Sequence, residues 1–259
     1  MCLITFQWQP SATNKLILSA NRDEFVQRPT QALQPWPDAE GVYAGKDLSQ
    51  GGSWLGIHKS GRFAALTNVR DMTRKGPENP ISRGTLVLDF LTSDLPALDY
   101  LQSLEDQSHC YDGYNLVVAD SQQLGYFSNR SGQSAQALKP GLYGLSNGLL
   151  NSPWPKVNSA TTALSHWLEG GDNKPLSLAS LLSATDIAAD EVLPNTGIGI
   201  EMERLLSCQK IITPNYGTRC STGLIWGREQ IQIAEISWQP DGSMQSQQEH
   251  LLNLQATVC

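Results

Sequence analysis

The chain has 259 residues, of which 40% are hydrophobic and 17% are charged, and its formal net charge is −7. This composition predicts a folded, enzyme-sized protein, and the acidic balance argues against nucleic acid or an anionic membrane as a partner. No apolar run approaches the ~18 residues of a membrane span, and the N-terminal sequence carries no basic leader. We therefore expect a cytoplasmic protein that does not cross a membrane. Its five cysteines are scattered and include no C-x-x-C pair, which favours reduced thiols over a disulfide framework.

The first third of the chain favours antiparallel hairpins. Residues 2–8 are apolar on both faces, as in a covered central strand, and they pair with a second apolar run at 15–20. Residues 53–58 and 62–68 predict another hairpin. Prolines and polar residues predict that 27–50 forms a long loop.

The remainder alternates helices and strands after a second loop at 70–80. Predicted helices cover 83–92, 95–104, 154–168 and 177–192, with Ser82 capping the first and Ser93 or Asp94 the second. Predicted strands cover 114–120, 123–129, 219–226, 230–238 and 244–250. This order favours one domain over 1–259, in which antiparallel sheets pack against outer helices, rather than a βαβ repeat.

Cys2 is the first candidate for chemistry. Removal of Met1 would leave a thiol and a free α-amine on one residue, and an amine with a pKa of ~7.7–8 can accept the thiol proton near neutral pH. The alternative is that Cys2 is a small buried apolar residue at the start of a strand.

Four consecutive polar residues, Asn21-Arg22-Asp23-Glu24, end the second predicted strand. They either form a turn, or lie beside residue 2 when the hairpin closes. There, an arginine would favour the thiolate and an aspartate could hold the α-amine. Because side chains alternate along a strand, Arg22 and Asp23 face the same side only if the strand ends or bulges between them.

Two asparagines and one arginine also stand at strand ends. Asn68 and Asn147 each follow an apolar run, where an amide can donate to a developing oxyanion or simply cap a turn. Arg219 would place a cation at the start of a late strand, or form a surface ion pair.

Other kinds of site have little support. The four histidines are dispersed without metal-ligand spacing, and there is no phosphate-binding loop or G-x-S-x-G elbow, so we expect no catalytic metal or nucleotide cofactor. The glycines of GGSWLG at 51–56 precede a strand rather than a helix. They predict a tight backbone approach near a pocket rim.

These motifs together resemble the NRDE family, also called the transport and Golgi organisation family. The shared motifs are Met-Cys, Asn-Arg-Asp-Glu at 21–24, GGSWLG at 51–56, Ala-Leu-Thr-Asn at 65–68, Leu-Ser-Asn-Gly at 145–148, Trp-Pro-Lys-Val at 154–157 and Tyr-Gly-Thr-Arg at 216–219. The resemblance implies an α+β fold, a four-layer αββα sandwich of the N-terminal-nucleophile hydrolase type.

It also implies roles for the residues named above. Cys2 corresponds to the nucleophile, Arg22 and Asp23 to its neighbours, Asn68 and Asn147 to the oxyanion and pocket asparagines, and Arg219 to a late pocket arginine. The bile-salt hydrolase and penicillin V acylase branch of that fold separates its Arg and Asp by two residues, whereas here they are adjacent.

Three functions follow from the resemblance. The first is intracellular haem binding and trafficking, with haem as cargo and Cys2 or His58 as a candidate axial ligand. The second is hydrolysis of a non-peptide C–N amide by Cys2, and the third is binding of a lipid or acyl-coenzyme A. Each predicts a small hydrophobic ligand, and none predicts an oligomeric state.

Overall fold

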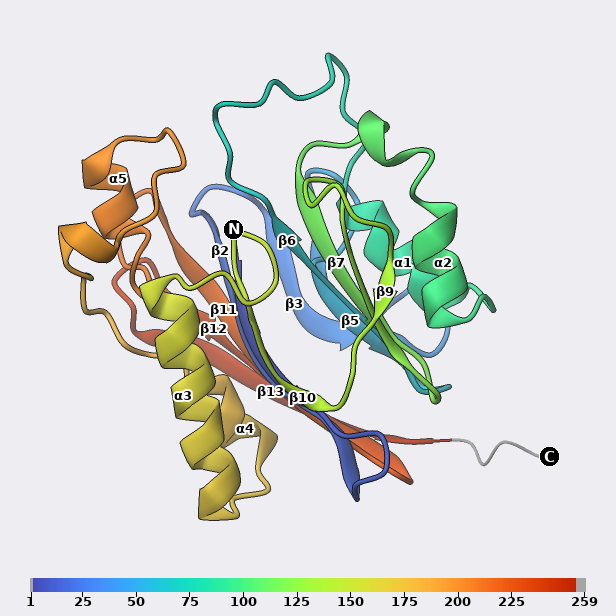
Figure 1. The fold of residues 1–259 in the computed structure, drawn as a ribbon. Coiled ribbons are helices and arrows are strands. Elements are labelled where there is room, and N and C mark those ends of the chain that lie inside the picture. The colour runs from blue at the N-terminus through green and yellow to red at the C-terminus, as the bar shows by residue number, and fades with distance from the viewer. Residues whose placement is uncertain (1, 255–259) are drawn as a thin grey trace.

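The computed structural model describes residues 2–254, so Met1 and Cys259 lie outside the described residues. Two antiparallel sheets stack face to face, with helices on both outer faces, and this confirms the predicted four-layer sandwich (Figure 1). The six-stranded sheet has the order β10 (Gly141–Leu145), β1 (Cys2–Trp8), β2 (Asn14–Phe25), β11 (Tyr216–Gly227), β12 (Gln230–Trp238) and β13 (Met244–Asn253). The seven-stranded sheet has the order β3 (Thr30–Pro35), β4 (Val42–Asp47), β5 (Leu55–His58), β6 (Arg62–Asn68), β7 (Tyr114–Ala119), β8 (Leu124–Ser128) and β9 (Gln136–Ala137).

The helices cover the two sheets separately. Helices α1 (Gly84–Thr92) and α2 (Ala97–Ser103) cover the seven-stranded sheet, whereas α3 (Pro155–Gly170) and α4 (Pro175–Ala179) cover the six-stranded one (Figure 1). Helix α5 (Ile200–Leu205) and short 3-10 helices at Ser108–Cys110 and Asp190–Val192 lie in the connections. Among residues 2–254, no helix is long and apolar enough to cross a membrane.

Alternation along β1 explains why this strand is apolar on both faces. Ile4, Phe6 and Trp8 point into the core between the two sheets, while Leu3 points outward and packs under α3 with Val157. Because side chains alternate, one strand can thus supply two separate cores.

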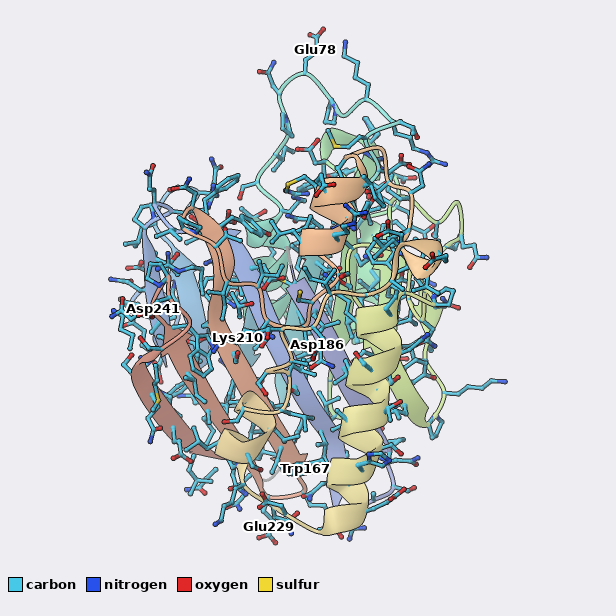
Figure 2. All side chains as sticks on the ribbon, turned by 90° about the vertical axis from the view of Figure 1, so that its left-hand side faces the viewer. Glu78, Trp167, Asp186, Lys210, Glu229 and Asp241 are labelled. Atoms are coloured by element: carbon cyan, nitrogen blue, oxygen red, sulfur yellow. The ribbon has the colours of Figure 1, made fainter. Side chains whose placement is uncertain are left out.

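Helix α3 has clear sequence boundaries. Pro155 occupies its first turn, where the missing N–H costs nothing, and Gly171 ends it in a left-handed conformation with a φ of 67°. Figure 2 shows the face that α3 and α4 cover, with Trp167 labelled between them. Glu78 marks the tip of the loop after β6, which projects from one end of the molecule.

Two predicted segments were wrong. The segment 27–50 contains strands β3 and β4, because β3 is an edge strand and tolerates Pro35 at its end. The predicted helix 177–192 ends at Ala179. Beyond Ala179, backbone carbonyls accept hydrogen bonds from residues distant in sequence and not from the next helical turn. The Asn21 side-chain amide donates to Leu182 O at 2.8 Å, and Lys210 N donates to Ala184 O at 2.9 Å.

The predicted helix caps were also wrong. No side chain caps α1, for which Arg83 rather than Ser82 is the N-cap residue. Helix α2 begins after Pro96, and its first amide, Ala97 N, donates to the Asp120 carboxylate at 2.7 Å. This cap comes from the end of β7, which is distant in sequence, so a local capping pattern could not predict it.

Candidate functional site

Cys2 is the first residue of β1 and pairs directly with Arg22 on β2. Residues that are directly opposite in an antiparallel pair project to the same face, and here that face looks towards the seven-stranded sheet. Only 7% of the Cys2 surface is exposed. The predicted hairpin therefore places the thiol and the guanidinium side by side.

Arg22 is held by contacts from both sheets. Its guanidinium carbon lies 4.1 Å from the centre of the Trp54 ring, and its Nη1 donates to Thr30 Oγ1 at 3.2 Å. Its Nη2 lies 3.8 Å from the Glu24 carboxylate. Stacking on an indole and a buried position fix this cation beside the thiol.

Arg22 and Asp23 project to opposite faces of β2. Its pairing to β1 is regular from Leu16 to Arg22, and the strand itself continues to Phe25. The register shift instead lies on β11, between Thr218, which pairs with Asp23, and Cys220, which pairs with Arg22. As the alternation argument requires, only Arg22 faces the space between the sheets, and Asp23 faces the helices.

A pocket of about 270 Å³ opens at Cys2. Its walls come from the ends of β1, β2 and β6, from the turn before β5 and from the start of α1. It is lined by Cys2, Arg22, Glu24, Arg28, Asp47, Gln50, Gly52, Ser53, Trp54, Leu66, Asn68, Pro80, Ile81, Ser82, Arg83, Gly84 and Asp112. Most of these groups are polar or charged, so the pocket suits a polar ligand.

Arg28 and Arg83 differ in how far their charges are already paired. Arg28 donates from Nε to the Asp47 carboxylate at 2.9 Å, and its Nη2 lies 2.8 Å from the same oxygen. Arg83 donates from Nη1 to the backbone carbonyl of Gly113 at 2.9 Å. Within residues 2–254, no carboxylate lies within 4.0 Å of its guanidinium. Arg83 is therefore the pocket cation with donors available for an anionic ligand.

The two predicted asparagines have different places. Asn68 lines the pocket, and its side-chain amide makes no hydrogen bond within residues 2–254. Asn147 is fully buried. Its side-chain Nδ2 donates to the backbone carbonyl of Asn68 at 2.9 Å, and its backbone carbonyl accepts from Arg70 N at 2.8 Å. Asn147 thus fixes the backbone that presents Asn68, and Asn68 is the one of the two that lines the same pocket as the thiol.

Arg219 and His58 are not among the residues that line this pocket. Arg219 is the extra residue of the β11 irregularity, and its Nη1 donates to the Val26 carbonyl at 2.6 Å. His58 ends β5, where its Nδ1 lies 2.7 Å from Ser60 Oγ and its Nε2 lies 3.0 Å from the Glu40 carbonyl. Both side chains already make contacts elsewhere, so their predicted roles receive no geometric support at Cys2.

The helix-facing side of β2 holds a second set of polar groups. Asp23 is 1% exposed, and Thr218 Oγ1 donates to its Oδ1 at 2.7 Å. Lys156, in the first turn of α3, is 3% exposed. Arg70 and Glu203 form a buried ion pair there at 2.7 Å.

Burial changes the acid–base chemistry of both faces. It raises the pKa of the Cys2 thiol, an effect that Arg22 opposes. It likewise raises the pKa of Asp23, an effect that Lys156 opposes most strongly, and it lowers the pKa of Lys156 to about 8. The thiol is therefore protonated at neutral pH and needs a base to become a nucleophile.

Sequence reasoning did not single out Trp54, Arg83 or Lys156. Trp54 sits within the glycine-rich motif, and Arg83 is the first residue of the predicted helix 83–92, where an arginine carries no distinctive signal. Lys156 did have a recognisable signal in the sequence, because it lies on one apolar face of the helix with Ala160 and Leu164, at spacings of four residues. A lysine on such a face is buried when the helix packs.

Comparisons with known proteins define the family and the fold. The family model described as Transport and Golgi organisation 2 matches residues 1–240. The bovine Transport and Golgi organization protein 2 homolog is 38% identical over 247 residues, which is 87% of this chain and 88% of that protein. The human homolog is 35% identical over 247 residues, or 86% and 87% of the two chains.

Two solved structures share the fold at low sequence identity. One is a Caenorhabditis elegans ortholog of N-acylethanolamine-hydrolyzing acid amidase, with a TM-score of 0.51, 11% identity and coverage of 86% of this chain and 92% of that one. The other is a C2A mutant of the conjugated bile acid hydrolase from Clostridium perfringens, with a TM-score of 0.50, 8% identity and 96% coverage of both chains. These likenesses confirm the predicted N-terminal-nucleophile hydrolase fold. The family match over residues 1–240 and the likeness to these two relatives show that the chain belongs to the Transport and Golgi organisation 2 family.

Proposed function

We propose that this protein hydrolyses a small C–N amide whose acyl part carries an anionic group, with Cys2 as the nucleophile. The observation that carries this proposal is that Cys2, Asn68 and Arg83 line one pocket. Within residues 2–254, the side-chain amide of Asn68 makes no hydrogen bond, and Arg83 donates only to a backbone carbonyl. Two proteins of the same fold are named as hydrolases, one of N-acylethanolamines and one of conjugated bile acids.

The reaction requires a free amine on Cys2. Burial keeps the thiol protonated, and an α-amine with a pKa of ~7.7–8 is the base that removal of Met1 would supply. The amine takes the thiol proton, and sulfur attacks the amide carbon to give a tetrahedral oxyanion. The proton then passes to the departing nitrogen as the C–N bond breaks. Water opens the resulting thioester and releases the acid.

Asn68 and Arg83 have separate roles in this scheme. The Asn68 amide donates to the oxyanion, which exists only after attack, and so lowers the barrier. Arg83 binds a carboxylate at the far end of the acyl group, because two N–H groups of a guanidinium can donate to the two carboxylate oxygens. We therefore expect selection for an acyl chain that ends in a carboxylate.

A matched pair of amides tests this proposal. Glutaryl 4-nitroanilide ends in a carboxylate, whereas pentanoyl 4-nitroanilide has the same chain length without the charge. We expect release of nitroaniline from the glutaryl compound, and a glutaryl group on Cys2 by mass spectrometry of protein whose Met1 has been removed. Preference for the glutaryl compound should disappear in Arg83→Met.

The control variants are Cys2→Ala, which removes the nucleophile, and Cys220→Ala, which removes a second buried thiol. Cys2→Ala should release no nitroaniline, and Cys220→Ala should match the wild type. Equal rates in Cys2→Ala and wild type, or no turnover of either compound by mature protein, would contradict the proposal. Saturable binding without turnover would instead favour a binding module for acyl compounds.

Haem is a second candidate ligand, favoured by the thiol of Cys2 beside the arginines of the pocket. A thiolate can bind haem iron, and arginines can pair with the propionate carboxylates. The pocket of about 270 Å³ is below the ~300–1,000 Å³ that is typical of ligand sites. A porphyrin would therefore lie across the mouth of the pocket.

Titration with haem distinguishes this candidate. If Cys2 is the axial ligand, the Soret band of wild-type protein should shift to a saturable end point, and Cys2→Ala should lose that shift. His58→Ala is the matched control, since His58 lies outside the pocket wall, and it should leave the shift unchanged. An absent or non-saturating shift in the wild type would remove haem as a ligand of this pocket.

A further inference from the structure

A second, smaller cavity adjoins the pocket at Cys2, and we call it the inner cavity. Its volume is about 10 Å³, which is room for about one water molecule. Its walls include the apolar side chains of Ile4, Ala20 and Leu55, which belong to the core between the two sheets. Apolar walls offer a water molecule few partners, so the inner cavity suits an apolar group.

The residues that line both spaces form the partition between them. These residues are Cys2, Arg22, Trp54 and Leu66. Trp54 is the largest of them, and only 9% of its surface is exposed. The guanidinium carbon of Arg22 lies 4.1 Å from the centre of the Trp54 ring. The indole and the guanidinium thus form a stacked pair within this partition.

Trp54 is held in place at its backbone and at the far edge of its ring. Its backbone carbonyl accepts from Leu66 N at 2.8 Å, which ties it to β6. The far edge of its indole lies over Gly45 of β4, where an added Cβ would be 2.3 Å from the ring atoms Cζ2 and Cη2. The missing side chain of Gly45 therefore leaves the indole its space, and these contacts fix the indole between the pocket and the inner cavity.

We propose that Trp54 determines which acyl chains the pocket accepts, because its indole closes the inner cavity to the ligand. This inference rests on the proposed function for its substrate, an amide attacked by Cys2, whereas the closure itself does not depend on turnover. With Trp54 in place, the acyl chain stays within the pocket of about 270 Å³, whose lining is mostly polar or charged. The substrate class is therefore an amide of a short acyl group. Removing the indole would join the two spaces beside Cys2, since the cavity left by a smaller core side chain collapses only in part.

Modification of the Cys2 thiol in the full-length protein tests the closure without any turnover. Methyl and hexyl methanethiosulfonate both convert a thiol into a mixed disulfide, and they differ only in the length of the alkyl group. Both react with the same thiolate, so its ionisation cancels from the ratio of the two rates, with Met1 present or removed alike. Peptide mass spectrometry separates Cys2 from the other cysteines. In Trp54→Ala, the hexyl-to-methyl rate ratio at Cys2 should rise about tenfold or more over the wild type, because each methylene that becomes buried contributes about fourfold.

The matched control is Trp36→Ala, which removes a buried tryptophan that is not among the residues lining either space. It should keep the wild-type ratio. An unchanged ratio in Trp54→Ala, or an equal rise in Trp36→Ala, would overturn the inference. If Trp54→Ala does not fold, Trp54→Leu removes the ring with a smaller loss of volume and gives the same comparison.

Turnover of two uncharged amides gives the second measurement. Octanoyl 4-nitroanilide has a longer alkyl chain than pentanoyl 4-nitroanilide and is otherwise the same. The octanoyl-to-pentanoyl ratio of kcat/KM should lie below one in the mature wild type and rise about tenfold or more in Trp54→Ala. A ratio above one in the wild type would overturn the inference and leave the role of Cys2 intact. Failure of the mature wild type to turn over any amide, the glutaryl compound included, would instead overturn the proposed function and leave the thiol-modification result standing.

Discussion

Replacing Asn68 by alanine is expected to slow acylation of Cys2 by ~10²–10³-fold, the effect of losing one donor to an oxyanion. Asn68 lines the pocket beside Cys2, and its amide makes no hydrogen bond within residues 2–254. Because the interaction forms only after attack, kcat should fall while KM for glutaryl 4-nitroanilide stays near its wild-type value.

Single-turnover measurements with mature protein would give the acylation rate directly. Asn158→Ala, on the exposed face of α3, is the matched control and should be as fast as wild type. Asn68→Asp tests the donor specifically, since it keeps the shape and removes the amide protons. An Asn68→Ala rate within threefold of wild type would mean that another group binds the oxyanion.

Replacing Gly52 by alanine is expected to destabilise the fold by about 3 kcal/mol, at the upper end of the cost of overpacking. A Cβ at Gly52 would lie 2.4 Å from the backbone carbon of Gly84, and Ser53 N donates to the Gly84 carbonyl at 3.1 Å. Backbone atoms cannot move aside as a side chain can. The start of α1 must therefore shift, and with it Arg83, which forms the adjoining pocket wall.

Urea unfolding measures the first consequence, and the glutaryl preference over the pentanoyl compound measures the second. Gly170→Ala is the matched control, because no heavy atom lies within 4 Å of the added carbon and its φ is ordinary. We expect Gly170→Ala to be as stable as wild type or slightly more stable. If Gly52→Ala kept both the unfolding free energy and the preference, the contact with Gly84 would be of no consequence.

The fold could be predicted from the sequence where the pattern of hydrophobic residues agreed with the positions of glycine and proline. Apolar runs located β1, β6, β7 and β12, and composition placed a helix at 154–168, where α3 spans Pro155–Gly170. The glycines at 51–56 predicted a close backbone approach, which Gly52 makes with Gly84. The helix expected at 177–192 failed because distant donors, such as the Asn21 amide, bind its carbonyls. Such donors belong to the tertiary structure and leave no local pattern.

Part of the candidate site could also be predicted. Hairpin pairing placed Arg22 beside Cys2, and alternation separated Arg22 from Asp23. Arg219 was harder to place, because the irregularity on β11 makes it an extra residue, and a strand pattern cannot reveal which partner strand bulges. Arg83 was missed because it reaches the pocket from the start of a helix of the other sheet.

The opposite orientations of Arg22 and Asp23 on β2 have an evolutionary consequence. Under the proposed function, the guanidinium beside the nucleophile and the carboxylate that would hold its amine occupy successive positions of one strand and project to opposite faces of the six-stranded sheet. Relatives could then acquire new ligands by changing residues of the pocket wall while the helix-facing side of β2 stays unchanged. If the proposed function holds, loss of Asp23 would conversely impair proton transfer and leave the pocket wall that binds the ligand unchanged.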